Sequence, residues 1–142
     1  MKTSQKGIDL IKSFESFQAK SYLCPANVWT IGYGHTKGVR KGQIITQSEA
    51  ERLLKEDLSV FEAAVNRICK DITQRQFDAL VSLAFNIGTT GFDNSTLVKL
   101  VKSNPNNPAI RSEFAKWKYA KGKILPGLVR RREAEANLYF EN

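Results

Sequence analysis

Glu15 is the side chain that the sequence places best for acid–base chemistry. It follows Phe14 directly and lies four residues after Ile11, at the edge of an apolar stripe with helical spacing. A carboxyl group at such an edge is partly removed from water, which favours its neutral form and makes it a candidate general acid near neutral pH. The ordinary alternative for a lone glutamate is an exposed carboxylate beside Lys12, so the residues that follow must distinguish the two.

Two more reactive side chains follow at short spacing, Cys24 after eight intervening residues and Thr30 after five more. His35, the only histidine, lies in the same glycine-rich stretch, which leaves a catalytic Cys24–His35 pair open as an alternative. No local signature of a cysteine protease surrounds either residue. One histidine and two cysteines separated by 44 residues make no metal-ligand cluster, and no phosphate-binding or dinucleotide-binding glycine motif is present. We therefore expect neither a metal nor a cofactor.

The hydrophobic pattern predicts the elements that must position these side chains. An amphipathic helix is expected over residues 7–18. Residues 22–46 mix glycines with β-branched and aromatic side chains, which is typical of short strands joined by tight turns. This first part of the chain is therefore expected to form a small lobe with antiparallel strands.

Helices dominate the rest of the pattern. Thr46 and Glu49 match a capping box before a long helix over residues 47–69, and residues 73–76 repeat the box before a helix that ends at Gly88. Shorter helices are expected near residues 95–103, 108–119 and 126–138. The predicted class is α+β: a single domain over residues 1–142, with a small lobe of about 1–58 and a larger all-helical lobe of about 59–142 joined by the long helix.

Composition and charge exclude several classes. The 142 residues are 42% hydrophobic and carry a formal charge of +8, which fits a globular protein and excludes disorder, while two cysteines are too few for a disulfide scaffold. No apolar run approaches the roughly 20 residues of a membrane helix, and the N-terminus lacks a secretory signal. Residues 99–132 hold ten basic side chains against one acid, Glu113: Lys99, Lys102, Arg111, Lys116, Lys118, Lys121, Lys123, Arg130, Arg131 and Arg132. Such a field attracts polyanions, unless it is only a solvated helix face.

The spacing of these candidate residues resembles the pattern of a known family. The pattern of Glu15, eight residues, Cys24, five residues and Thr30 is similar to the catalytic pattern of the phage lysozyme (endolysin) family, glycoside hydrolase family 24. The resemblance continues through residues 28–36, 84–88, 91–95 and 125–135, so it covers essentially the whole chain. Several pieces in the right order and spacing make it specific.

The resemblance implies a lysozyme-like fold and hydrolysis of the β-1,4 bond between N-acetylmuramic acid and N-acetylglucosamine in peptidoglycan. It implies that Glu15 is the general acid and that Thr30 holds the attacking water or stabilises the reacting centre. It also places Thr36, Phe85 and Ser95 where relatives contact the glycan. No separate wall-binding domain is expected.

Cys24 departs from the pair of carboxylates that glycosidases usually carry, because many members of the family have Asp there. A thiol at this position is open to three roles: a base that activates water, a nucleophile, or a polar group that holds water. The first and third predict inversion at the anomeric carbon and the second predicts retention. Cys69 is expected to be a core residue, and a Cys24–Cys69 disulfide is the less favoured alternative. His35 is expected to be structural and to pair with an acid such as Asp71 or Asp78.

The resemblance also implies partners. Peptidoglycan is the expected substrate, and the basic residues 99–132 are expected to draw the protein to the anionic cell envelope. A monomer is expected, held in the host cytoplasm until a holin opens the route to the wall. The apolar residues near 124–129 are expected to pack in the helical lobe, with insertion into a membrane surface as the alternative. A catalytically impaired wall-binding module, a transglycosylase and a basic nucleic-acid-binding domain remain as alternative functions; no nucleic-acid motif supports the last of these.

Overall fold

The computed structural model describes residues 1–142 and begins with a helix shorter than the pattern predicts. Helix α1 (Gln5–Phe14) starts at Ser4, whose hydroxyl accepts a hydrogen bond from the Gly7 amide. It ends at Glu15, which has an extended backbone with φ −98° and ψ 112°. Phe17 therefore leaves the helical stripe, and its ring packs at 5.6 Å from the Tyr33 ring instead.

A small antiparallel sheet forms the first lobe, as predicted. Strands β1 (Gln18–Leu23) and β2 (Trp29–Gly32) pair directly, and an isolated bridge joins Lys20 to Ile44. The turn between the strands contains Asn27, which has a positive φ of 61°. Strand β1 begins four residues earlier than the predicted strand region, because the chain becomes extended as soon as α1 ends.

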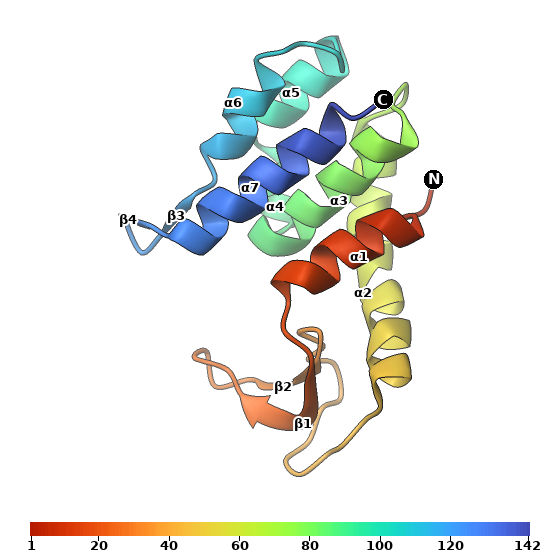
Figure 1. Cartoon of the computed structure of the whole chain (residues 1–142), viewed down its shortest axis with the longest axis vertical. Coiled ribbons are helices and arrows are strands. Elements are labelled where there is room, and N and C mark those ends of the chain that lie inside the picture. The colour runs from red at the N-terminus through yellow and green to blue at the C-terminus, as the bar shows by residue number, and fades with distance from the viewer.

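The long helix α2 (Gln47–Ile68) connects the two lobes. The predicted capping box is confirmed: Thr46 accepts from the Glu49 amide, and the Glu49 side chain accepts from the Thr46 amide. Figure 1 shows the first turns of α2 beside the loops of the small lobe and its last turns beside the helices of the large lobe. A helix of 22 residues spans roughly 33 Å, so α2 sets the separation of the two lobes.

The large lobe is built around helix α3 (Gln74–Ile87), which is buried along most of its length and contacts α1, α2 and α7. The other helices of this lobe are α4 (Thr89–Asp93), α5 (Thr96–Ser103), α6 (Ile110–Ala115) and α7 (Pro126–Tyr139). Although α1 opens the chain, it packs in this lobe: the Ser4 amide donates to Asp78 of α3, and Lys6 pairs with Glu141 at 2.7 Å. The two ends of the chain therefore lie side by side (Figure 1).

A second hairpin was not predicted. Strands β3 (Tyr119–Ala120) and β4 (Lys123–Ile124) pair around Lys121 and Gly122, which both have positive φ, as two-residue hairpin turns require. The helix predicted over 108–119 therefore ends at residue 115.

The expectation that the apolar residues near 124–129 pack inside the large lobe is wrong at three positions. Ile124, Leu125 and Val129 are 52%, 42% and 39% exposed. The hairpin carries the chain away from the lobe just before α7 begins, which leaves these side chains on the surface (Figure 1). None of the helices is long and apolar enough to cross a lipid bilayer.

Candidate active site

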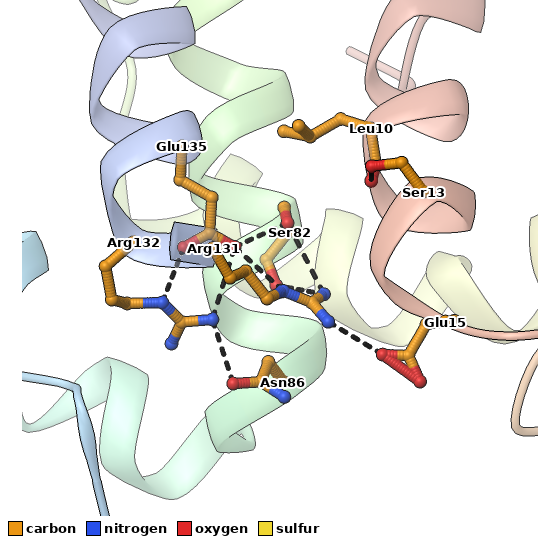
Figure 2. A network of polar contacts seen from close by, with 8 residues as sticks. All are labelled: Leu10, Ser13, Glu15, Ser82, Asn86, Arg131, Arg132 and Glu135. Atoms are coloured by element: carbon orange, nitrogen blue, oxygen red, sulfur yellow. Dashed lines mark hydrogen bonds and ion pairs between the residues drawn. The ribbon is translucent and has the colours of Figure 1, made fainter. Parts of the chain in front are cut away.

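Glu15 lies directly after the last turn of α1 and faces the N-terminal half of α7 (Figure 2). Its Oε2 accepts a hydrogen bond from Arg131 Nη1 at 2.7 Å, and its side chain keeps 27% of its surface exposed. This short contact with a buried guanidinium fixes the direction in which the carboxyl group points. Glu15 is therefore an oriented carboxylate with one side open.

Arg131 is itself buried and held from three sides. Besides Glu15, its Nε lies 3.3 Å from Glu135 Oε2, and its Nη2 donates to the Ser82 carbonyl oxygen at 3.3 Å. The guanidinium also lies 5.7 Å from the centre of the Phe14 ring. Figure 2 shows this network bridging α1, α3 and α7.

A cavity of about 470 Å³ opens beside Glu15, between the loop that follows β2 and the helices of the large lobe. It is lined by Glu15, Gly34, Thr36, Lys37, Asp57, Val60, Phe61, Phe85 and Asn86. The structure thus brings together three predicted site residues, Glu15, Thr36 and Phe85. A larger groove of about 920 Å³ lies between α1 and α2, but its charged side chains pair with one another, as Arg52 does with Glu56.

Gly34 lets the backbone approach the carboxylate. It has a φ of +87°, and a Cβ added there would lie 3.7 Å from Glu15 Oε1. Because this φ is in the left-handed region, only glycine adopts it without strain. The glycine-rich stretch seen in the sequence therefore forms one wall of the cavity.

Cys24 and Thr30 flank the turn between β1 and β2, and neither is among the residues that line the cavity. Backbone hydrogen bonds from Val28 and Ala26 lower the pKa of the Cys24 thiol, and the Thr30 side chain acts in the same direction. Thr30 is buried and donates its hydroxyl proton to the Val28 carbonyl at 2.9 Å. The turn thus holds both side chains together and favours the thiolate.

His35 pairs with an acid, but the predicted partners Asp71 and Asp78 are wrong. Its Nδ1 lies 2.8 Å from Asp57 Oδ2 on α2, and its Nε2 lies 2.9 Å from the Lys37 carbonyl oxygen. Asp78 is occupied by Ser4 in the other lobe. With both ring nitrogens engaged, His35 ties the loop after β2 to α2, and the Cys24–His35 pair is not formed.

Ser95 is the predicted glycan contact that the structure places elsewhere. It is 6% exposed, and its hydroxyl caps α5 by accepting from the Val98 amide and donating to the Phe92 carbonyl. Ser95 is therefore the N-cap of α5 and is not among the residues that line the cavity, so its contact with the glycan stays a prediction.

The prediction that the basic residues within 99–132 lie at the surface is wrong for two of them. Arg131 and Arg132 are 3% and 1% exposed, so they belong to the interior and do not present charge at the surface. The sequence analysis did not predict that Arg131 contacts Glu15, or that Glu135 contacts Arg131. The available signal was the spacing of three and four residues between these arginines and Glu135, which places all three on one side of a helix.

Both cysteines are free. Cys69 is buried at the end of α2, and Cys24 follows β1 in the other lobe. Since disulfides need Cα atoms within about 7 Å, the predicted alternative of a Cys24–Cys69 bond does not fit this arrangement. No group of three or more potential metal-ligating side chains is clustered anywhere in the chain.

The chain is similar to known proteins along nearly its whole length. Residues 12–135 match the family model described as Phage lysozyme. The chain is 46% identical to the endolysin of Acyrthosiphon pisum secondary endosymbiont phage 1, with 98% of each chain covered. It is 43% identical to the endolysin of Bacillus phage B103, with 99% of this chain covered and 54% of that relative's length. Among solved structures, the muramidase domain of SpmX from Asticaccaulis excentricus is similar with a TM-score of 0.93 and 36% identity, covering 99% of both chains.

Fold, site and matches together define a class, the lysozyme-type hydrolases, and the two-lobed fold predicted from the sequence is confirmed. Within that class, the chain belongs to the phage lysozyme family. The predicted membership of the phage lysozyme family is thereby confirmed.

Proposed function

We propose that this protein is an endolysin that hydrolyses the β-1,4 bond between N-acetylmuramic acid and N-acetylglucosamine in peptidoglycan, for host lysis and phage release. The observation that carries the proposal is the Glu15 carboxylate, held by Arg131 beside the cavity between the lobes. The catalytic pair is asymmetric, with one oriented carboxyl group and one activated thiol.

Glu15 is the general acid in this proposal. It gives its proton to the glycosidic oxygen as the bond breaks, and negative charge then develops on the carboxylate. Arg131 already points at Oε2, so it stabilises that charge most when the proton has left. The contact therefore stabilises the state that proton donation produces.

Cys24 acts from the turn at the end of β1. Its lowered pKa gives the thiol a larger thiolate fraction near neutral pH, which supports a role as base or nucleophile. Thr30 is proposed to hold the reacting water beside it. Proton NMR of the first product anomer separates the roles, since a base gives inversion and a nucleophile gives retention.

Thr36 and Phe85 are proposed to contact the glycan. Thr36 lines the cavity from the loop after β2, and Phe85 lines it from α3. Phe85 also packs edge-on against Phe61, with ring centres 5.4 Å apart. An aromatic face and a hydroxyl in one cavity suit a sugar ring, which has one apolar side and a polar rim.

The partners follow from the same proposal. Exposed basic residues within 99–132 attract the anionic cell envelope, and the protein acts as a monomer. It remains in the host cytoplasm until a holin opens the inner membrane. The similarity to phage endolysins supports this order of events.

Muropeptide release from purified peptidoglycan tests the proposal. Wild type is expected to release fragments with a new reducing-end N-acetylmuramic acid, identified by mass spectrometry, and Glu15→Gln is expected to release none. Anhydro ends would instead indicate a transglycosylase. Binding to peptidoglycan without release by either protein would indicate a non-catalytic wall-binding module.

A further inference from the structure

A buried carboxylate lies directly behind the Glu15–Arg131 pair. Glu135 on α7 has no exposed surface, and its Oε2 accepts from Ser82 Oγ at 2.5 Å and from Arg131 Nε at 3.3 Å. Its Oε1 lies 2.8 Å from Arg132 Nε. Burial raises the pKa of the Glu135 carboxyl, and the two guanidiniums and the Ser82 hydroxyl oppose that rise. Two guanidiniums within 3.3 Å of its oxygens favour the ionised form of Glu135.

Arg132 makes Glu135 indispensable to the charge balance. Arg132 is 1% exposed, and its Nη1 has no hydrogen-bond partner. Apart from Glu135, its polar partner is the Asn86 side chain, a neutral acceptor at 2.8 Å. The core behind Glu15 therefore holds two cations and one anion, and a single positive charge is left to face Glu15.

The guanidinium of Arg131 transmits this arrangement to the cavity. Its Nη1 bonds to Glu15, its Nε to Glu135 and its Nη2 to the Ser82 carbonyl, so each nitrogen has a fixed partner (Figure 2). Rotation of the planar group would break all three contacts together. The orientation that holds Glu15 thus depends on the carboxylate at its other edge.

We propose that Glu135 is a positioning residue for the reaction: it orients Arg131 toward Glu15 and cancels one of the two buried positive charges behind the acid. This inference rests on the proposed function, in which Glu15 donates a proton. It assigns the motif of two arginines and a glutamate on α7 to catalysis, in addition to the stability of the large lobe.

The proposal predicts opposite effects for two substitutions in the same cluster. Glu135→Gln leaves two buried cations behind Glu15, which favours the ionised form of the acid and moves the alkaline limb of the kcat/KM profile to lower pH. Arg132→Met removes one cation and moves that limb to higher pH. Each shift is expected to be roughly one pH unit, since the charges interact through the protein interior. The double variant has the same net buried charge behind Glu15 as wild type. Its alkaline limb is therefore expected to return to the wild-type pH.

Other charged groups near Glu15 stay the same in these variants. Lys37 and Asp57 line the same cavity, Asp57 pairs with His35, and the Cys24 thiol lies in the turn after β1. Because Cys24 also titrates, the pH profile alone does not identify the group responsible. A carbon-13 NMR titration of the Glu15 carboxyl identifies it directly, and it requires folding without requiring activity.

The experiment measures kcat/KM against pH and the Glu15 carboxyl titration in wild type, Glu135→Gln, Arg132→Met and the double variant. Glu133→Gln is the matched control, because Glu133 is exposed on the same helix and its loss changes the net charge equally. Opposite shifts in the two single variants, recovery in the double variant and no shift in Glu133→Gln support the proposal.

A uniform loss of activity with an unmoved Glu15 titration would overturn it, because a purely structural Glu135 lowers stability without a pH signature. If Glu135→Gln does not fold, Arg132→Met decides: an unmoved or lowered titration overturns the proposal. The expected opposite shifts of the Glu15 titration, in a protein that releases no muropeptides, would support the electrostatic role of Glu135 and reject the proposed function. The two failures are therefore distinguishable.

Discussion

Two thiols in this chain have opposite environments. Backbone hydrogen bonds lower the pKa of Cys24 on the surface turn, whereas burial raises the pKa of Cys69 to about 11. A thiol reacts as its thiolate, which forms as the pH rises through the pKa. Cys24 is therefore expected to react with an alkylating reagent at lower pH than an ordinary thiol. Cys69 is expected to remain unreacted in the folded protein.

Iodoacetamide labelling followed by mass spectrometry measures this difference from about pH 6 to about pH 10. Native protein is expected to carry one label, on Cys24, with a midpoint below that of a free cysteine peptide. Cys69 is expected to be labelled only in denaturant. Cys24→Ser removes the native label and is expected to lose most activity, while Cys24→Asp keeps some. A fully active Cys24→Ser variant would remove Cys24 from the mechanism.

The His35–Asp57 pair is expected to contribute to the stability of the small lobe. Asp57→Asn weakens a partly buried contact between the loop after β2 and the long helix α2. The expected loss is about 1–3 kcal/mol in the free energy of unfolding, measured by urea denaturation. Asp71→Asn, at an exposed aspartate outside this contact, is the control and is expected to change little. Equal stability of the two variants would contradict this role for the pair.

At the residue level, the sequence predicts what local spacing encodes. Glu15 was predicted from its place at the edge of an apolar stripe, and Thr36 and Phe85 from the resemblance to the family; the three line one cavity. The partner of Glu15 was not found, because Arg131 lies 116 residues away and an isolated arginine in a basic run looks like surface charge. Only packing distinguishes a buried arginine from an exposed one.

At the element level, close packing between α1 and α3 makes one glycine irreplaceable. A Cβ at Gly7 would lie 2.7 Å from Thr3 Cγ2 and 2.8 Å from Asp78 Cβ, so neighbouring atoms would have to move. Gly7→Ala is expected to cost about 1–3 kcal/mol of stability, because an overpacked contact forces displacement.

Gly127→Ala on α7 is the matched control for Gly7→Ala. The nearest atom to its added Cβ is Arg130 Nη2 at 3.8 Å, which is ordinary contact. Alanine favours helix over glycine, so this variant is expected to be neutral or more stable by up to about 1 kcal/mol. Thermal denaturation of both variants measures the difference, and a stable Gly7→Ala protein would show that α1 shifts easily against α3.

The elements that the sequence predicted best have local start signals. The capping boxes at Thr46 and Thr73 set the beginnings of α2 and α3, and both boxes form as expected. The end of α1 was missed because Phe17 continues its stripe, although its ring packs on Tyr33 of the sheet lobe. The hairpin of β3 and β4 was missed because strands of two residues show no alternating pattern. Its one local signal was Gly122.

At the scale of the whole molecule, the surface charge is expected to control activity on cell walls. The hairpin carries Lys118, Lys121 and Lys123 beside exposed Tyr119 and Ile124, which makes it a basic projection with an apolar edge. Screening shortens the reach of such charges to about 8 Å at physiological salt. Lysis of intact walls is therefore expected to fall steeply as salt rises.

Replacing all three hairpin lysines by glutamine is expected to lower wall lysis several-fold at low salt and to flatten its salt dependence. Replacement of Lys20, Lys41 and Lys70, which are exposed elsewhere, changes the net charge equally and serves as the control. Turbidity assays across a salt series measure both triple variants. Equal effects would show that net charge guides the protein and that the position of the hairpin does not matter.

The placement of α1 in the large lobe has a consequence for biosynthesis. The ribosome makes α1 first, but its partners α3 and α7 emerge later, and Arg131 is among the last residues to appear. The nascent chain therefore carries Glu15 for most of its synthesis without the cation that orients it. Translation that stops before α7 yields a product without this pair. Because the site combines residues from the beginning and the end of the chain, it is complete only when synthesis of the chain is nearly finished.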